Sequence, residues 1–109
     1  MLKNLADLLK PAKEQGYGVA CFNVFGYEDA LAVVKAAEKR NASVILSINL
    51  DMRQFMPLEN IASMLIPLAE ASTASVCLHL DHTYDVETVK KAVDLGFSSV
   101  MYDLSLIHI

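Results

Sequence analysis

The sequence lacks any apolar run of the roughly 18 residues that a membrane-spanning helix needs. Its first ten residues, MLKNLADLLK, carry too many charges for a secretory signal peptide. A basic excess is absent too, since 9 lysine and arginine residues stand against 13 aspartate and glutamate residues, for a net charge of −4. These absences argue against a membrane protein and against a nucleic acid as the partner of the chain.

Cysteines are also few. Cys21 and Cys77 both lie within apolar, strand-like runs. Without a secretory signal they are expected to be reduced core residues of a cytoplasmic protein. The chain has no low-complexity segment and no linker, and 54% of its residues are hydrophobic. Its 109 residues therefore suit one small domain or a piece of a larger one.

Hydrophobic periodicity predicts helices that alternate with strands. Helices are predicted at residues 4–13, 28–39 and 58–71, and a last one between the N-cap Asp85 and the C-cap Gly96. Short apolar runs predict strands at residues 19–24, 43–48, 75–80 and 98–102. Pro67 is expected to kink or shorten the helix in which it lies.

Strands that are apolar on both faces and separated by helices indicate a parallel sheet with helical cover. Spacing leaves two α/β architectures open, an open sheet and one half of an eight-stranded barrel. In both, ligands bind at the carboxyl ends of the strands. Polar residues stand at those predicted ends, namely Asn23, Asn49, Asp51, Asp81, His82 and Asp103. We therefore expect the functional site at this rim.

The pair Asp81–His82 has two interpretations. The imidazole can bind a metal such as zinc, and the carboxylate can move a proton. Alternatively, Asp81 and Asp85 lie in a solvated turn and cap the following helix. His79, on the same side of its strand as Asp81, is interpreted as a hydrogen-bonded structural histidine rather than a ligand. By itself, Asn23 is more typical of a turn than of a binding site.

Three stretches, GYGVACFNV, AAEKRNASVIL and VCLHLDHTYDVETVKKAVDLGFSSVMYD, closely resemble the N-terminal half of class II, zinc-dependent ketose-bisphosphate aldolases. The resemblance runs from about Gly16 to Asp103, and LHLDH and DLGFSSVM are its most specific parts. The family fold is a (β/α)8 TIM barrel. The resemblance therefore implies that residues 1–103 form the N-terminal half of such a barrel, with about four strands.

The resemblance also implies an activity, the reversible cleavage of a ketose 1,6-bisphosphate to dihydroxyacetone phosphate and glyceraldehyde 3-phosphate. Zn²⁺ would act as a Lewis acid on the ketose carbonyl. His82 is implied to be one of the zinc ligands and Asp81 the acid/base group at the C4 hydroxyl. Asn23 matches a residue that positions the substrate, and Asp103 an acidic position near a secondary metal site. Asn49 is also expected to bind substrate, although around Ser47 and Asn49 the sequence departs from the small and hydroxyl residues that touch substrate in the family, which leaves the identity of the substrate open.

The intact family enzymes are dimers or tetramers, and the sequence leaves open which ketose bisphosphate, fructose, tagatose or a relative, is the substrate. After Asp103 the family pattern continues with a small residue and SH, whereas this chain reads LSLIHI. Residues 104–109 are therefore expected to be a non-native tail, in which His108 is no ligand.

A half-barrel leaves the edges of its first and fourth strands open. The chain alone is thus expected to be marginally stable, prone to aggregate or dimerise, and inactive. Two other interpretations stay open. One is a non-catalytic half-barrel that self-associates or binds a phosphosugar, and the other is an unrelated phosphosugar-handling α/β protein in which Asp81–His82 only caps a helix.

Overall fold

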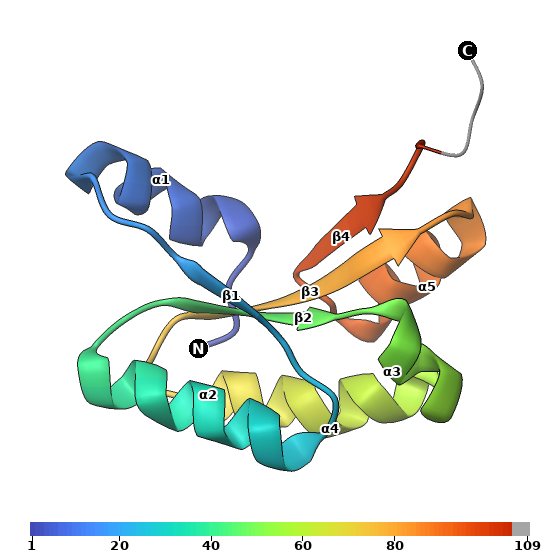
Figure 1. Cartoon of the computed structure of the whole chain (residues 1–109), viewed down its shortest axis with the longest axis horizontal. Coiled ribbons are helices and arrows are strands. Elements are labelled where there is room, and N and C mark those ends of the chain that lie inside the picture. The colour runs from blue at the N-terminus through green and yellow to red at the C-terminus, as the bar shows by residue number, and fades with distance from the viewer. Residues whose placement is uncertain (106–109) are drawn as a thin grey trace.

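A computed structural model describes residues 1–105, apart from the side chain of Leu50. Helices and strands alternate in the order α1 (Leu5–Gln15), β1 (Ala20–Asn23), α2 (Tyr27–Arg40), β2 (Val44–Ile48), α3 (Leu50–Phe55), α4 (Leu58–Ala71), β3 (Val76–Thr83), α5 (Val86–Leu95) and β4 (Ser99–Tyr102), as Figure 1 shows. All three strand pairings are parallel. The predicted alternating α/β organisation is confirmed.

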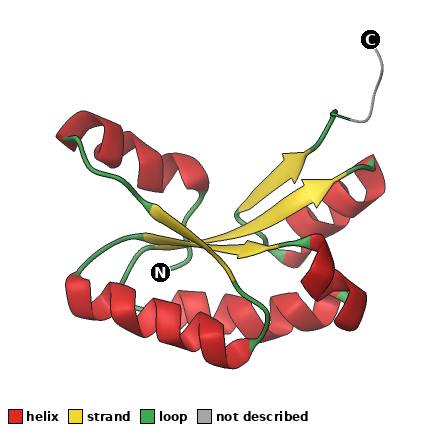
Figure 2. Ribbon diagram, viewed as in Figure 1, coloured by secondary structure: helices red, strands yellow, loops and turns green. Residues whose placement is uncertain are grey.

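The strands follow one another across the sheet in chain order, β1-β2-β3-β4 (Figure 2). In doubly wound open sheets the spatial order of the strands reverses at a switch point. In a β/α barrel each strand instead lies next to the strand that follows it in the chain. The observed order therefore favours the half-barrel over the open sheet.

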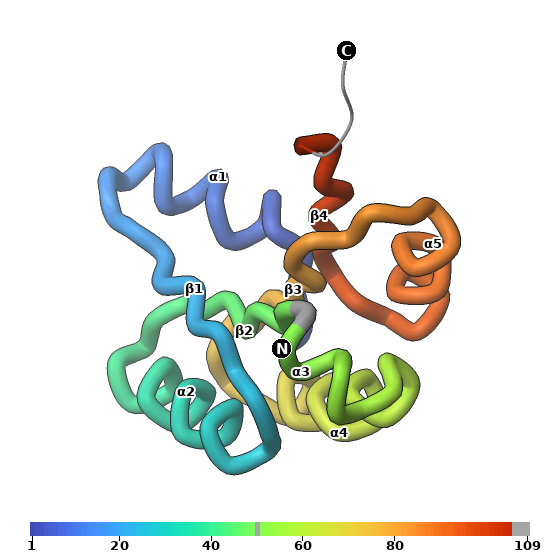
Figure 3. The backbone as a smooth tube through the Cα atoms, turned by 45° about the vertical axis from the view of Figure 1, so that its right-hand side comes forward, coloured from blue at the N-terminus to red at the C-terminus, as the bar shows by residue number. Residues whose placement is uncertain are grey.

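The helices cover the two faces of this sheet unequally. Figures 1 and 3 show α2 and α4 side by side against one face and α1 on the opposite side. Because successive side chains of a strand point to opposite faces, Leu46 and Leu78 are fully buried in the core under α2 and α4. Ile45 and Cys77 instead pack against Leu8 of α1. This second face would line the interior of a closed barrel, and we call it the inner face.

The sequence correctly predicts both ends of α5. The Asp85 side chain accepts a hydrogen bond from the Thr88 backbone N–H at 2.7 Å. Gly96 ends the helix with φ of 104°, a conformation that favours glycine. A Cβ atom at this position would also lie 3.0 Å from Ile66 Cδ1 of α4, so a larger residue would have to displace that methyl group in addition to adopting the positive φ.

The expectation that Pro67 shortens its helix is wrong, because α4 runs through it to Ala71. The apolar face of α4, with Ile61, Leu65 and Ala69, is fully buried. Burial of that face stabilises the helix beyond what local propensity provides, so the missing N–H of one exposed proline is tolerated.

Two further predictions need correction. Strand β3 extends to Thr83 rather than ending at residue 80, so Asp81 and His82 lie within its last part. Cys21 is exposed rather than a core residue, although Cys77 is fully buried. The reason is position in the sheet: β1 is an outer strand, and all four of its residues are exposed.

The outer strands leave apolar surface uncovered. A hollow of about 390 Å³ lies between β1 and α2, and its lining includes Ala20, Phe22, Val33 and Val44. Phe22 is 49% exposed. Within residues 1–105, no helix combines the length and the apolar character needed to cross a membrane.

Candidate active site

The carboxyl end of β3 is irregular, and this irregularity places the candidate site. His82 has φ of 29°, which is uncommon for a residue other than glycine. Regular pairing with β4 breaks between Leu80 and Thr83 and resumes at Thr83↔Tyr102. A bulge of this kind bends a strand and redirects its side chains. The fully buried Thr83 fixes the far side of the bulge, since its hydroxyl donates to the Met101 carbonyl oxygen.

His82 is held by Asp103, the residue that follows β4. The distance from His82 Nδ1 to Asp103 Oδ2 is 2.7 Å. A carboxylate only accepts hydrogen bonds, so we assign the proton to Nδ1, which leaves Nε2 as the nitrogen available to a ligand. The hydrogen bond to Asp103 raises the pKa of His82, and the charge of Asp81 adds to that rise.

The carboxyl group of Asp103 is strongly acidic. Hydrogen bonds from the Ser105 hydroxyl and the Ser105 backbone N–H, followed by the bond from His82, lower the pKa of Asp103 to about 2. Asp103 is therefore an anion at neutral pH. In this structure Asp103 contacts and orients His82. The resemblance implies a different role for Asp103, near a secondary metal site.

Asp81 lies between two imidazoles on the inner face. Its Oδ2 is 3.6 Å from His82 Nε2, and its Oδ1 is 3.7 Å from His79 Nε2. His79 is fixed on its other side, where Nδ1 lies 2.8 Å from Ser99 Oγ. The interpretation of His79 as a hydrogen-bonded histidine is thus supported, and Asp81 contacts histidines instead of capping α5. Of the two aspartates weighed as caps, only Asp85 caps α5.

A row of polar residues crosses the inner face beneath this cluster. The sheet register aligns Asn23 with Ser47, Ser47 with His79, and His79 with Ser99. The next row toward the amino ends is apolar or sulfur-bearing, with Cys21 aligned to Ile45 and Ile45 to Cys77. The structure therefore places Asn23 in the polar row, on the same layer as His79.

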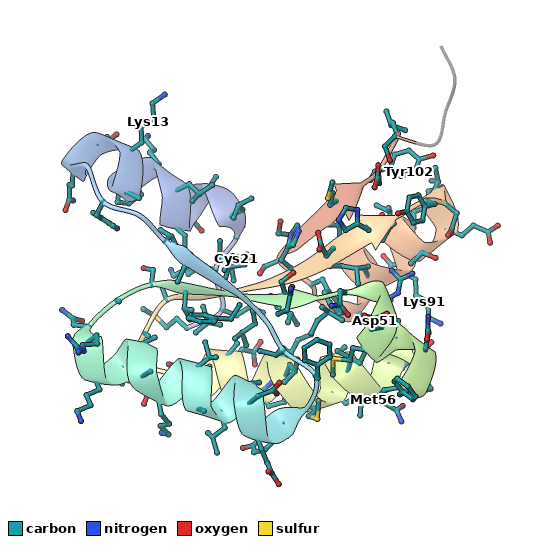
Figure 4. The ribbon with its side chains drawn as sticks, viewed as in Figure 1. Lys13, Cys21, Asp51, Met56, Lys91 and Tyr102 are labelled. Atoms are coloured by element: carbon teal, nitrogen blue, oxygen red, sulfur yellow. The ribbon has the colours of Figure 1, made fainter. Side chains whose placement is uncertain are left out.

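Asn49 lies in a different part of the rim. A pocket of about 260 Å³ is lined by Asn49, Asp51, His82 and Tyr84. The Asn49 side-chain oxygen accepts a hydrogen bond from the Met52 backbone N–H at 3.2 Å, so it also caps α3. Figure 4 shows Asp51 on α3, at the carboxyl end of β2. Asn49 and His82 thus share one pocket.

Sequence reasoning assigned no role to three residues of this region. Asp51 was noted on the rim, and its place after β2 was the available signal. Tyr84 lies two residues after His82, but no motif or spacing in the sequence indicates a role for it. The contact of Ser99 with His79 can be inferred only from the strand register, because the two residues are 20 positions apart in the chain.

The residues present fit one position of a zinc site. Catalytic zinc sites have three protein ligands, which include neutral imidazole, and a second group commonly holds the other ring nitrogen. His82, with Nε2 available and Nδ1 held by Asp103, matches that pattern. Within residues 1–105, no group of three or more histidine, cysteine, aspartate or glutamate residues is arranged to hold a metal. The described residues therefore supply one ligand and its orienting partner, and no complete site.

Comparisons with known proteins agree with this geometry. The family described as fructose-bisphosphate aldolase class-II matches residues 3–109. A fructose-bisphosphate aldolase of Thermus caldophilus is 35% identical over 105 residues, which are 96% of this chain and 34% of that protein. A 6-phospho-5-dehydro-2-deoxy-D-gluconate aldolase of Shouchella clausii is 36% identical over 102 residues, 91% of this chain and 35% of that protein.

The fold is also found among solved structures. The crystal structure of the YdjI aldolase from Escherichia coli K12 superposes with a TM-score of 0.92 at 29% identity, covering 99% of this chain and 41% of that one. This match confirms the half-barrel architecture. The chain spans about a third of the length of the curated relatives it matches.

Proposed function

The chain belongs to the class II fructose-bisphosphate aldolase family, and from this membership we propose that it forms the N-terminal half of the barrel of a zinc-dependent aldolase. Members of this family are lyases that act on phosphorylated sugars and are generally zinc-dependent. The proposed reaction is the reversible cleavage of a ketose 1,6-bisphosphate to dihydroxyacetone phosphate and glyceraldehyde 3-phosphate.

The observation that carries the proposal is the cluster of Asp81, His82 and Asp103 on the inner face. A carboxylate stands within 3.6 Å of an imidazole nitrogen, and that imidazole is held by a second carboxylate at 2.7 Å. This arrangement offers a metal ligand and a proton-transfer group at the same strand end, where barrel enzymes have their active sites.

We assign the following roles. His82 binds zinc through Nε2, and Asp103 fixes the orientation and protonation of the ring through Nδ1. When bound, zinc supplies Lewis-acid polarisation of the substrate carbonyl. Asp81 removes the proton of the C4 hydroxyl during cleavage and returns it during condensation. The other zinc ligands would come from outside the described residues.

Two residues are proposed to bind the substrate. Asn49 lines the same pocket as His82, and its side-chain NH₂ group is available to donate because only its oxygen caps α3. Asn23 lies one layer deeper and is proposed to orient a hydroxyl group of the sugar. Relatives with different named substrates match the chain about equally well, so the particular sugar phosphate is to be decided by assay.

The role of Asp81 is tested by Asp81→Asn in the whole, zinc-loaded protein. Loss of a proton-transfer group is expected to lower kcat for the ketose bisphosphate by about 10²–10⁴-fold. The zinc content should be unchanged. The matched control is Asp94→Asn, the same chemical change on the exposed last turn of α5. Unchanged turnover in Asp81→Asn would refute the assignment of Asp81, and a zinc-loaded parent protein that cleaves no ketose phosphate would refute the proposed function.

We also propose that residues 104–109 form a non-native tail on a barrel half of residues 1–103. The proposal rests on the departure of LSLIHI from the family pattern after Asp103. Ser105 belongs to the described part of the chain, and His108 lies outside it. Sequencing the source locus across codon 103 tests the proposal, because a native gene that encodes the same six residues would contradict it.

A second candidate function is a non-catalytic half-barrel that associates with a copy of itself. It is favoured by the uncovered apolar hollow beside β1 and by the exposed side chain of Phe22. This candidate predicts association without turnover.

A further inference from the structure

A histidine that the proposed reaction does not use lies against the proposed proton-transfer group. His79 is half-buried, with a side chain that is 16% exposed, and its Nε2 is 3.7 Å from Asp81 Oδ1. From this arrangement we propose that His79, itself held by Ser99, is a positioning residue for the Asp81 carboxylate. The proposal rests on the proposed function of Asp81.

The register of the sheet places His79 between two serines. His79 is aligned with Ser47 of β2 on one side and with Ser99 of β4 on the other. Ser47 is only 2% exposed, so the layer that His79 shares with it is largely shielded from solvent on the β2 side. His79 Nδ1 lies 2.8 Å from the Ser99 hydroxyl oxygen. An imidazole held at Nδ1 by Ser99 can keep a group next to its Nε2 in place.

Burial determines the charge of this histidine. Burial lowers the pKa of His79, and the nearby Asp81 carboxylate opposes that change only in part. The ring therefore carries a single N–H at neutral pH, as a neutral imidazole does. Ser99 can donate to or accept from Nδ1, because a hydroxyl does both. Asp81 can only accept.

Only one of the two tautomers satisfies both neighbours. With the proton on Nε2, His79 donates toward Asp81 Oδ1 while the Ser99 hydroxyl donates to Nδ1. With the proton on Nδ1, the Nε2 lone pair would face an anionic oxygen. We therefore assign the Nε2–H tautomer, which the acceptor-only Asp81 carboxylate selects and to which the Ser99 hydroxyl adapts by donating to Nδ1.

The consequence concerns the direction in which Asp81 points. His79 takes up Oδ1, and Oδ2 is left on the side of His82, 3.6 Å from its Nε2. The oxygen directed at the proposed metal position and the substrate is therefore Oδ2. A separation of 3.7 Å between His79 and Asp81 is longer than a hydrogen bond, and such catalytic contacts commonly shorten when the substrate is bound.

The kinetic test uses the whole, zinc-loaded protein with His79→Ala and His79→Gln. His79→Ala is expected to lower kcat about tenfold to a hundredfold with KM and zinc content unchanged, because misplacement by 1 Å can cost about a hundredfold. His79→Gln, whose side-chain NH₂ group can replace the Nε2–H donor, is expected to recover part of that loss. Equal kcat in His79→Ala and the parent protein would overturn the proposal, and so would equal loss in both variants.

Ser99 supplies a second and independent test. Nitrogen NMR of ¹⁵N-histidine-labelled protein reports which nitrogen of His79 carries the proton. We expect the Nε2–H form in the parent protein, a shifted Nδ1 resonance with the proton still on Nε2 in Ser99→Ala, and no change in Ser98→Ala. Ser98 is the matched control because its hydroxyl oxygen accepts from the Leu78 backbone N–H at 2.9 Å and not from a histidine.

The NMR result separates the two proposals. An Nδ1–H tautomer of His79 in the parent protein would overturn the positioning role whatever the enzyme does. If the protein proved inactive on every ketose phosphate while the Nε2–H form and the contacts of His79 with Ser99 and Asp81 were observed, the proposed function would fail and the contact would stand. Asp81→Asn must then shift the His79 nitrogen resonances, and unchanged resonances would contradict the contact.

Discussion

At the scale of single residues, the site is a set of paired side chains in which each ionisable group has a defined neighbour. Ser99 holds His79, Asp81 stands between His79 and His82, and Asp103 holds His82. Such second contacts orient a ligand and tune its basicity, and their loss commonly costs metal affinity. We therefore propose that Asp103 acts on the metal site through its contact with His82.

This gives a prediction for metal binding. Asp103→Asn is expected to weaken zinc binding by the whole protein by about 10–100-fold, because the amide orients the His82 ring less well than the carboxylate. His82→Ala is expected to lose more, since it removes the ligand itself. Competition with a zinc-binding dye measures both. An Asp103→Asn variant with the zinc affinity of the parent would show that Asp103 does not support His82.

At the scale of secondary-structure elements, α5 connects β3 to β4, and each of its ends has a defined cap. Asp85 accepts hydrogen bonds from the backbone N–H and the hydroxyl of Thr88, at 2.7 Å and 2.9 Å. These bonds lower the pKa of Asp85, the backbone bond first. At the other end, Gly96 turns the chain back into β4, which brings Ser99 and Asp103 to their histidine partners.

The cap makes stability depend on pH in a defined direction. Because the pKa of Asp85 is lower in the folded state than in the unfolded chain, its stabilising contribution is complete above the ordinary aspartate pKa of about 3.9 and is lost as the pH falls below it. Thermal unfolding of the parent chain and of Asp85→Asn should thus differ more at pH 6 than at pH 3.

Asp94→Asn is the control for this measurement, because a carboxylate in the last turn of α5 caps no N-terminal amide. A difference between the parent and Asp85→Asn that stays constant between the two pH values would contradict the role of the charged cap. If Asp94→Asn changed the pH dependence of stability as Asp85→Asn does, the effect would come from the overall charge and not from the cap.

At the scale of the whole molecule, α2 and α4 cover one face of the sheet, α1 packs on part of the other, and the outer strands are open. Edge strands with unpaired backbone groups and apolar neighbours are templates for association. The hollow of about 390 Å³ beside β1, with Phe22 in its wall, is an uncovered apolar feature of this edge. The chain by itself is therefore expected to associate.

The prediction is measured by sedimentation of the 109-residue chain over a range of concentrations. We expect the mass to rise with concentration, and Phe22→Lys to shift the equilibrium toward the monomer. Phe55→Lys is the matched control, because Phe55 is 88% exposed on α3 and does not line the hollow. A parent chain that stays monomeric throughout, or an equal effect of both substitutions, would contradict association through this edge.

The sequence by itself determined the alternation of helices and strands, the caps at Asp85 and Gly96, and the rim on which Asp81, His82 and Asp103 lie. These features depend on local chemistry: periodic burial, a side chain that accepts a backbone N–H, and the freedom of glycine at positive φ. The motif around LHLDH carried the expectation of the half-barrel, and the sequential strand order and the structural match confirmed it.

Only the tertiary structure decided which residues touch. The bulge at His82, the pairing of His82 with Asp103 across 21 residues, and the contact of His79 with Ser99 across 20 depend on the register between β3 and β4. The exposure of Cys21 and the continuity of α4 through Pro67 likewise depend on neighbours that are distant in the chain. Register and burial arise from long-range packing, and hydrophobic periodicity along one segment contains no information about the partner against which that segment will pack.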